Sequence, residues 1–250
     1  MRNPIKIFFF TLSFLSNLPV YWFVREEYKE INPKGMIPFF PVVGAFCGIL
    51  NILWYHLFIH LFSREVTILL ILLFQYVFFN LFHFDGFLDF FEALFSGKRE
   101  KKEIIKIMKD PHIGSFASFF GFIYLLLKFF LLRDLLFFDI GFLYLYPIIG
   151  RVSQVLIMGF SHPAKREGLG YLFYEIPFGF LVLSYIIGFF LFLFRGLGLW
   201  WIYILVPLFV SFLMRSISNR VLGGFTGDVV GAGNEVGELI SLFVFKLIFI

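Results

Sequence analysis

The chain contains a single cysteine, Cys47, and few charged residues: only 15% of its 250 residues are Asp, Glu, Lys or Arg, against about a quarter in an ordinary soluble domain. One cysteine cannot form an intrachain disulfide, and no Cys and His spacing matches a zinc site, so neither device stabilises this fold. The shortage of charge excludes a water-soluble globular protein. With 60% hydrophobic residues and a mean hydropathy of +0.90, the composition indicates a polytopic membrane protein in contact with the lipid bilayer.

Long apolar runs recur along the chain, each near the ~20 residues that cross the hydrocarbon core as a helix. The candidate spans are 36–62, 66–84, 113–132, 135–160, 176–194, 197–214 and 236–250. None shows the apolar and polar alternation of barrel strands. We therefore expect an all-α fold, a polytopic helical bundle with about seven transmembrane helices (range about six to eight) that forms one transmembrane catalytic domain over 1–250.

The first apolar segment, within 5–24, carries Thr11, Asn17 and Pro19 and is a poor spanning helix. We interpret it as an interfacial or re-entrant N-terminal helix. It follows Arg2 and Lys6 as a signal peptide would, but no small-residue cleavage site follows, so we expect it to remain in the mature protein.

The basic residues are distributed unevenly between the two sides of the predicted bundle. Most of them lie in loops 25–35, 85–112, 161–175 and 215–235, whereas the opposite loops hold only Arg64, Arg133 and Arg195. The positive-inside rule places the basic side in the cytoplasm and the chain in the cell (inner) membrane. Because the net charge of +4 is explained by orientation, we expect no nucleic-acid partner.

Three acids follow the second span without an intervening Lys or Arg: Asp85, Asp89 and Glu92. In a helix their spacing of i, i+4 and i+7 places them on one face. Like charges so close repel each other unless a cation neutralises them, and oxygen ligands alone suit Mg²⁺. A solvated acidic face explains this segment equally well when it is taken alone.

A second segment, 223–238, combines glycines with Asp228, Glu235 and Glu238. Glycines such as Gly223, Gly224 and Gly227 let backbone N–H groups approach a phosphate, and the acids add metal ligands. The pairs at 227/231 and 233/237 also match the small-residue pattern of packed membrane helices. Packing accounts for the glycines but leaves the acids unexplained.

Other polar residues fall on the same predicted side. Asp110 and His112 precede a span, and Lys165 and Arg166 lie in a short loop where they either bind phosphate or only mark the topology. His83 is a ligand, a base or an ordinary interfacial histidine. Arg151, inside a span, either faces the site or extends to the interface, because a lipid-facing charge is costly.

Carboxylates, glycine-rich backbone and a few basic residues at one membrane surface suit Mg²⁺-assisted transfer from a donor of the nucleoside-diphosphate type. The metal would neutralise the diphosphate, a basic residue would stabilise transition-state charge, and a carboxylate or histidine would accept the proton of an attacking hydroxyl. The residues do not name the substrates.

The order and spacing of the motifs resemble the cobalamin synthase family, the adenosylcobinamide-GDP ribazoletransferases. The resemblance covers nearly the whole chain and is carried by segments 14–20, 40–44, 83–89, 108–114, 166–170 and 223–238. Each segment is weak evidence alone, and the set together is specific. One departure is Glu92, where the family's acidic stretch is expected to end in Asp.

The resemblance implies an Mg²⁺-dependent membrane enzyme that joins adenosylcobinamide-GDP to α-ribazole, or to its 5'-phosphate, and releases GMP. It implies metal or diphosphate ligands at Asp85, Asp89, Asp228 and Glu235, with support from Glu92, Asp110 and Glu238. Phosphate or nucleotide contacts are expected from Lys165, Arg166, Gly223, Gly224 and Gly227, with Arg166 also a catalytic candidate. The general base stays open between His83 and Asp89, as does the oligomeric state, a homo-oligomer included.

Two other functions compete with this interpretation. A CDP-alcohol phosphotransferase also uses clustered Asp and Mg²⁺, but Asp85 and Gly86 are not followed by the Ala-Arg pair that this family carries. A secondary transporter would place its ionisable residues near the bilayer midplane and often show repeated halves. The acids here cluster instead at one predicted membrane edge.

Overall fold

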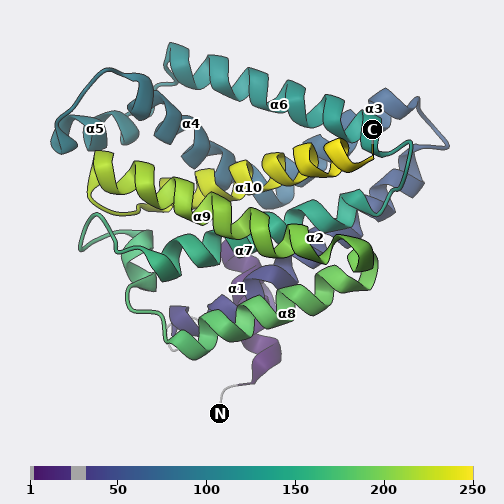
Figure 1. The fold of residues 1–250 in the computed structure, drawn as a ribbon, viewed down its shortest axis with the longest axis horizontal. Helices are drawn as coiled ribbons and strands as arrows, with labels where there is room; N and C mark the ends of the chain where they lie inside the picture. The colour runs from purple at the N-terminus through teal and green to yellow at the C-terminus, as the bar shows by residue number, and fades with distance from the viewer. Residues whose placement is uncertain (1–2, 24–31, 250) are drawn as a thin grey trace.

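The protein is a bundle of α-helices in the computed structural model, which describes residues 3–23 and 32–249 (Figure 1). Within these residues the only β pairing is an isolated bridge between Pro163 and Phe225. The predicted all-α class is confirmed. Arg2 of the N-terminal segment and Arg25 and Lys29 of loop 25–35 lie outside the described residues.

The elements follow one another along the chain in a simple order. They are α1 (Pro4–Leu15), η1 (Tyr21–Phe23), η3 (Pro33–Phe39), α2 (Phe40–Phe58), α3 (Arg64–Gln75), the π-helical η4 (Tyr76–Asn80), α4 (Leu81–Phe95), α5 (Lys101–Met108), α6 (Ser115–Leu135), α7 (Phe142–Phe160), η5 (Leu169–Phe173), α8 (Phe178–Gly196), η6 (Leu197–Leu199), α9 (Trp200–Leu222) and α10 (Gly227–Ile248).

Among the described residues, five stretches are long and apolar enough to cross a membrane. They are Pro33–Phe58, Arg64–Phe95, Ser115–Leu135, Phe142–Phe160 and Phe178–Leu222, and the last contains both α8 and α9. The second helical stretch does not end at residue 84 as predicted but continues through the acidic segment to Phe95. Likewise α10 begins at Gly227 and not near residue 236 as predicted. The glycines and acids of 227–235 lower the hydropathy, but the helical backbone hydrogen bonds continue through them.

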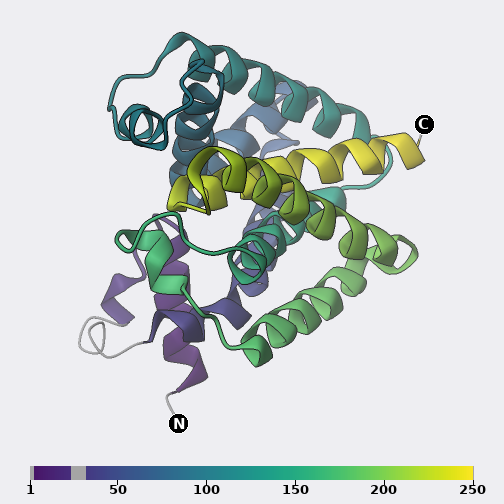
Figure 2. The ribbon, with the colours of Figure 1, turned by 60° about the vertical axis from the view of Figure 1, so that its left-hand side comes forward.

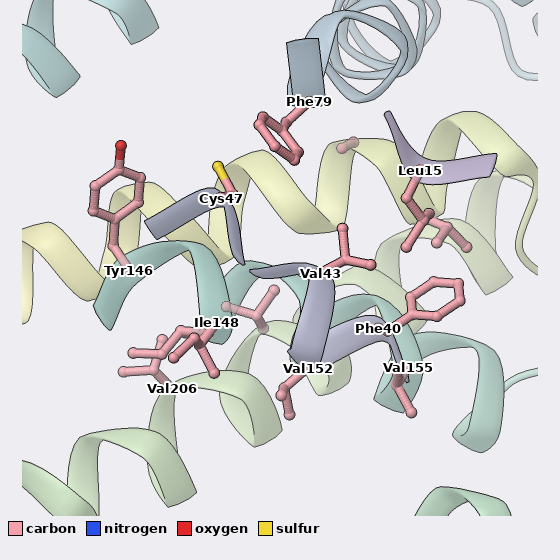
Figure 3. Close-up of a cluster of buried hydrophobic side chains, with 14 of the residues drawn as sticks. Leu15, Phe40, Val43, Cys47, Phe79, Tyr146, Ile148, Val152, Val155 and Val206 are labelled. Atoms are coloured by element: carbon pink, nitrogen blue, oxygen red, sulfur yellow. The ribbon is translucent and has the colours of Figure 1, made fainter. Parts of the chain in front are cut away.

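Helix α7 forms the centre of the bundle, between α2, α8, α9 and α10 (Figures 1 and 2). Its residues 142–158 are all buried. Figure 3 shows Phe40, Val43 and Cys47 of α2 beside Ile148 and Val152 of α7. Gly44 and Gly48 let the two backbones meet, since a Cβ at Gly44 would lie 2.8 Å from the carbonyl oxygen of Pro147. Small residues at helix contacts are the usual way for membrane helices to pack closely.

Helix α1 has 12 residues, which corresponds to about 18 Å, well short of the ~30 Å hydrocarbon core. It packs against η3 and α2, and Phe10, Leu12 and Leu15 are buried there. The structure therefore contains the predicted N-terminal helix, which is too short to span, and its interfacial or re-entrant placement stays a prediction. Just after it, the backbone N–H and the side-chain amide of Asn17 donate to the carbonyls of Phe78 (2.7 Å) and Val77 (2.9 Å) in the π-helical turn.

The connections that carry the predicted site gather at one end of the bundle (Figure 1). They are the α4–α5 connection, loop 161–168 and the turn between α9 and α10. Lys101 Nζ donates to the carbonyl of Ala164 (2.8 Å), and Ala164 N donates to the carbonyl of Phe225 (2.8 Å). The connections of the polar segments therefore gather at one end of the molecule. Glu235 and Glu238 do not lie at this edge as expected, because α10 carries them into the interior of the bundle, where they meet Lys128 of α6.

Helices α4 and α10 contact each other at two glycines. A Cβ at Gly86 would lie 2.8 Å from the Cα of Asp228, and a Cβ at Gly231 would lie 3.1 Å from the Cα of His83. The missing side chains let the two acid-bearing helices pack backbone to backbone. The expected packing role of the glycines is thus met at Gly231.

We expect Gly86→Ala to separate α4 from α10 and to lower the free energy of unfolding by about 1–3 kcal/mol, because backbone atoms cannot move aside as a side chain can. The measurement is thermal unfolding in detergent. Gly179→Ala on α8 is the matched control, since a Cβ there meets nothing within 4 Å. An equal melting temperature for the two variants would contradict the close contact.

Candidate active site

Two adjoining cavities lie at the end of the bundle where the polar segments meet. The larger, about 500 Å³, lies between α1, the start of α2, α4, α7, η5 and α10. The smaller, about 180 Å³, lies between loop 161–168, η5 and the start of α10. Gly170, Gly227 and Asp228 line both cavities. The first residues of α10 therefore stand at the junction of the two.

Three predicted ligands, Asp85 and Asp89 of α4 and Asp228 of α10, come together beside this junction. The charges of Asp85 and Asp228 both act on Asp89. Asp85 is exposed and lines the larger cavity, and no hydrogen bond to its carboxylate is found among the described residues. Like charges held together in this way favour a bound cation.

The N-terminus of α10 opens into the smaller cavity. Thr226 caps the helix by accepting from Val229 N (3.3 Å), and a Cβ at Gly227 would meet nothing within 4 Å. The first N–H groups of a helix and its dipole favour an anion such as phosphate. Lys165 lines the same cavity. Its pKa is lowered by burial and by the nearby charge of Lys109, while the charge of Asp228 opposes this change.

The other two glycines of the predicted phosphate segment have conformational reasons for being glycine. Gly223 has φ +71° and ends α9 in the left-handed region. Gly224 has φ +149°, and a Cβ there would clash with His162 and Ala164. Neither lines a cavity described here, so of the three glycines only Gly227 is placed to contact a phosphate in one of them.

Three further predicted residues lie apart from the acidic group. Glu92 accepts a hydrogen bond from Ala117 N (2.7 Å) at the start of α6 and so acts as a helix cap. Asp110 is exposed and accepts from the backbone N–H of His112 (3.0 Å), and hydrogen bonds from His112 lower the pKa of its carboxyl. Arg166 is exposed and lines neither cavity.

His83 lines the larger cavity but is bound to Arg151 of α7. Its Nε2 lies 2.7 Å from Nη1 of Arg151, and because a guanidinium only donates, the ring nitrogen accepts. Arg151 is buried and also donates to the carbonyl of Phe79 (3.1 Å) and to Asn80 Oδ1 (3.2 Å). Of the two alternatives for Arg151, the structure shows the first: its side chain faces the protein interior and contacts His83, a predicted site residue.

Glu235 and Glu238 are fully buried in α10, in a group that we call the buried ion cluster. Its other members are Gln75, Tyr76, Asn80, Tyr124, Lys128 and Asn234. Lys128 Nζ lies 2.5 Å from Glu238 Oε2 and 3.8 Å from Glu235 Oε2.

Every carboxylate oxygen of the buried ion cluster accepts two hydrogen bonds. Asn80 and Asn234 each donate to Oε1 of both glutamates, while Tyr76 and Tyr124 donate to Oε2 of Glu235. The two acids are thus satisfied by protein partners and lie apart from the group formed by Asp85, Asp89 and Asp228. Their role as metal ligands stays a prediction.

Sequence reasoning assigned no role to the partners of these glutamates. The signal was present, because Gln75, Asn80 and Lys128 are polar residues inside apolar runs, where a polar residue faces the protein interior and finds a partner. Which partner each one finds depends on the packing of α3, η4, α6 and α10, which the sequence pattern does not specify.

Within the described residues, no three His, Cys, Asp or Glu side chains already stand in an arrangement that holds a metal ion. The donor set nevertheless fits Mg²⁺, which prefers oxygen and commonly binds through one or two carboxylates together with water and substrate phosphates. Asp85 and Asp228 are carboxylates of this kind, and both line the larger cavity. They are the residues that would hold such an ion.

We expect Lys128→Met to lower the free energy of unfolding by about 3–5 kcal/mol, because it leaves buried carboxylates without their cation. Thermal unfolding in detergent measures this loss, and adding Glu238→Gln to the same chain should recover part of it. The matched control is Lys246→Met: Lys246 pairs with Asp134 at a partly exposed site, where a pair contributes about 1 kcal/mol or less. Equal effects of the two lysine variants would refute the role of Lys128.

The chain matches the model of the family described as cobalamin-5-phosphate synthase over residues 7–246. It is 36% identical to an adenosylcobinamide-GDP ribazoletransferase from Thermosipho melanesiensis, over 90% of this chain and 91% of the relative. Proteins of the same name from Clostridium kluyveri and Caldanaerobacter subterraneus are each 32% identical, covering 99% and 98% of this chain and 99% and 100% of theirs. No solved structure matches. The chain belongs to the cobalamin-5-phosphate synthase family.

Proposed function

We propose that this protein is an Mg²⁺-dependent transferase that joins adenosylcobinamide-GDP to α-ribazole, or to its 5'-phosphate, and releases GMP. The reaction is supported by the name of its relatives and by the family to which the chain belongs. The structural observation that carries the proposal is the group of Asp85, Asp89 and Asp228 beside the open N-terminus of α10. A diphosphate donor requires both kinds of group: backbone N–H groups that bind its phosphates and carboxylates that bind its cation.

In this reaction a ribose hydroxyl of the ribazole attacks the phosphorus attached to the cobinamide side chain. A new P–O bond forms, the bond from that phosphorus to the oxygen of GMP breaks, and GMP leaves with the electron pair. When bound, Mg²⁺ supplies charge neutralisation for the diphosphate. The N–H groups at the start of α10, together with Lys165, hold the phosphates and stabilise the negative charge that develops on them.

The proton of the attacking hydroxyl goes to a carboxylate of the same group, for which Asp89 is the leading candidate. Asp89 is half-buried on α4 and lies near Asp85 and Asp228. His83 remains the other predicted base, but the nitrogen that would take the proton faces the guanidinium of Arg151. This contact favours the carboxylate.

The site faces the cytoplasm in this proposal, and the chain lies in the cell membrane. The support is the excess of Lys and Arg at the end of the bundle that carries both cavities, for example Lys98, Arg99 and Lys101. The opposite end holds Arg133 and Arg195, which pair with Asp134 (3.0 Å) and Asp139 (2.6 Å). Soluble nucleotide and corrinoid substrates would then reach the site without crossing the bilayer.

The function is tested by measuring GMP release from membranes given adenosylcobinamide-GDP and α-ribazole. We expect turnover with Mg²⁺, none with EDTA, and a loss of about 100-fold or more in Asp85→Asn, which removes a negative charge that would hold the cation beside the diphosphate. Asp139→Asn, at the other end of the bundle, is the control that keeps full activity. Turnover that persists in EDTA would refute the metal, and absence of turnover by folded protein would refute the reaction.

Orientation is tested by labelling engineered cysteines in intact cells with a membrane-impermeant maleimide. The background is low because Cys47 is buried and is the sole cysteine of the chain. We expect Gly198→Cys, in η6, to be labelled from outside and Arg99→Cys to be labelled only after lysis. The reverse pattern would place the site on the outer face.

A further inference from the structure

The larger cavity has walls of a specific chemical kind. Phe14 of α1, Phe40 of α2 and Phe173 of η5 all line it, and the ring of Phe173 packs edge-on against Phe14 (5.8 Å between centroids) and Phe40 (5.9 Å). Met158 of α7 adds a polarisable thioether. Aromatic rings and thioethers are side chains that pack favourably against a flat aromatic ligand.

The uncharged polar side chains that line this cavity already have protein partners. Ser13 Oγ donates to the carbonyl of Phe10 (2.9 Å). His83 Nε2 and Gln154 Oε1 both meet Nη1 of Arg151, at 2.7 and 3.2 Å. The polar groups left to a ligand are therefore the carboxylates of Asp85 and Asp228 and the backbone at Gly227, beside the smaller cavity.

The two substrates of the proposed reaction differ in how they match such a wall. The base of ribazole is a benzimidazole, which has no exocyclic donors or acceptors, whereas the guanine of the donor has both. Among the described residues of this lining, no free side-chain donor is left for the O6 and N7 acceptors of guanine, and a buried acceptor without a partner costs about 1–3 kcal/mol. The volume of about 500 Å³ is in the range for a ligand of nucleoside size. It is too small to hold both a nucleoside and a corrin ring with its side chains.

The geometry points to the larger cavity as the binding site of the ribazole substrate, with its aromatic base against Phe14, Phe40 and Phe173 and its ribose toward Asp85 and Asp228. This inference rests on the proposed function. The donor's diphosphate then occupies the smaller cavity, and the two substrates meet at Gly227 and Asp228, which line both. The ribose hydroxyl and the phosphorus are thus brought together beside the acidic group.

The test reduces the volume of the larger cavity by enlarging one side chain that lines it, at a position where a larger side chain is compatible with folding. Phe14 is only half-buried, so Phe14→Trp fills cavity space while the core stays intact. We expect the KM for α-ribazole to rise about tenfold or more, a change of ~1.4 kcal/mol in binding, with the KM for adenosylcobinamide-GDP unchanged. Phe8→Trp is the matched control on the same helix, because Phe8 contacts Phe9 and Phe39 and does not line the cavity.

A second measurement does not require turnover. Equilibrium binding of α-ribazole alone to the detergent-solubilised protein should weaken about tenfold in Phe14→Trp and remain unchanged in Phe8→Trp. Suppose that the wild-type protein transfers normally and that Phe14→Trp raises the KM for adenosylcobinamide-GDP instead of the KM for α-ribazole. That result would overturn the inference and place guanosine in the cavity. Unchanged constants for both substrates would overturn it as well. In either case the transferase itself would stand, whereas a wild-type chain without turnover would refute the function.

Discussion

The structure depends on the neutralisation of two carboxylates that are buried in the interior of the helical bundle. Glu235 and Glu238 of α10 are fully buried, and the charge of Lys128 from α6 makes their burial tolerable. Because α3 supplies Gln75 and η4 supplies Tyr76 and Asn80, the same group connects four elements, α3, η4, α6 and α10. Asn80 also accepts from Arg151, which holds His83 at the cavity, so a chain of polar contacts runs from the core to the candidate site.

The sequence predicted the fold class and the gathering of the polar connections at one end, because both follow from hydropathy and from the distribution of Lys and Arg. It placed residues 85–112 in a loop, whereas α4 continues through the acidic segment to Phe95. The start of α10 was placed several residues too late, since glycines and acids interrupt the apolar pattern but not the backbone hydrogen bonds.

The division of the acids into two groups was not predictable from the sequence. Asp228 and Glu235 lie on the same helix, and spacing alone treats them as partners. Only the packing shows that Glu235 meets Lys128, Tyr76 and Tyr124, while Asp228 faces the cavities. Glu92 is a similar case, because its capping of α6 depends on a contact with a residue 25 positions away. Long-range contacts of this kind leave no local pattern.

The π-helical turn at Tyr76–Asn80 has a consequence for how this chain is compared with its relatives. A π turn contains one residue more than an α turn, so it rotates everything before it by about 100° relative to everything after it. A single helical wheel drawn over 64–95 would therefore assign the lipid-facing side of α3 to the wrong residues. Within this family, a one-residue gap in an alignment near position 78 would mark a change of helix phase and not the loss of a contact.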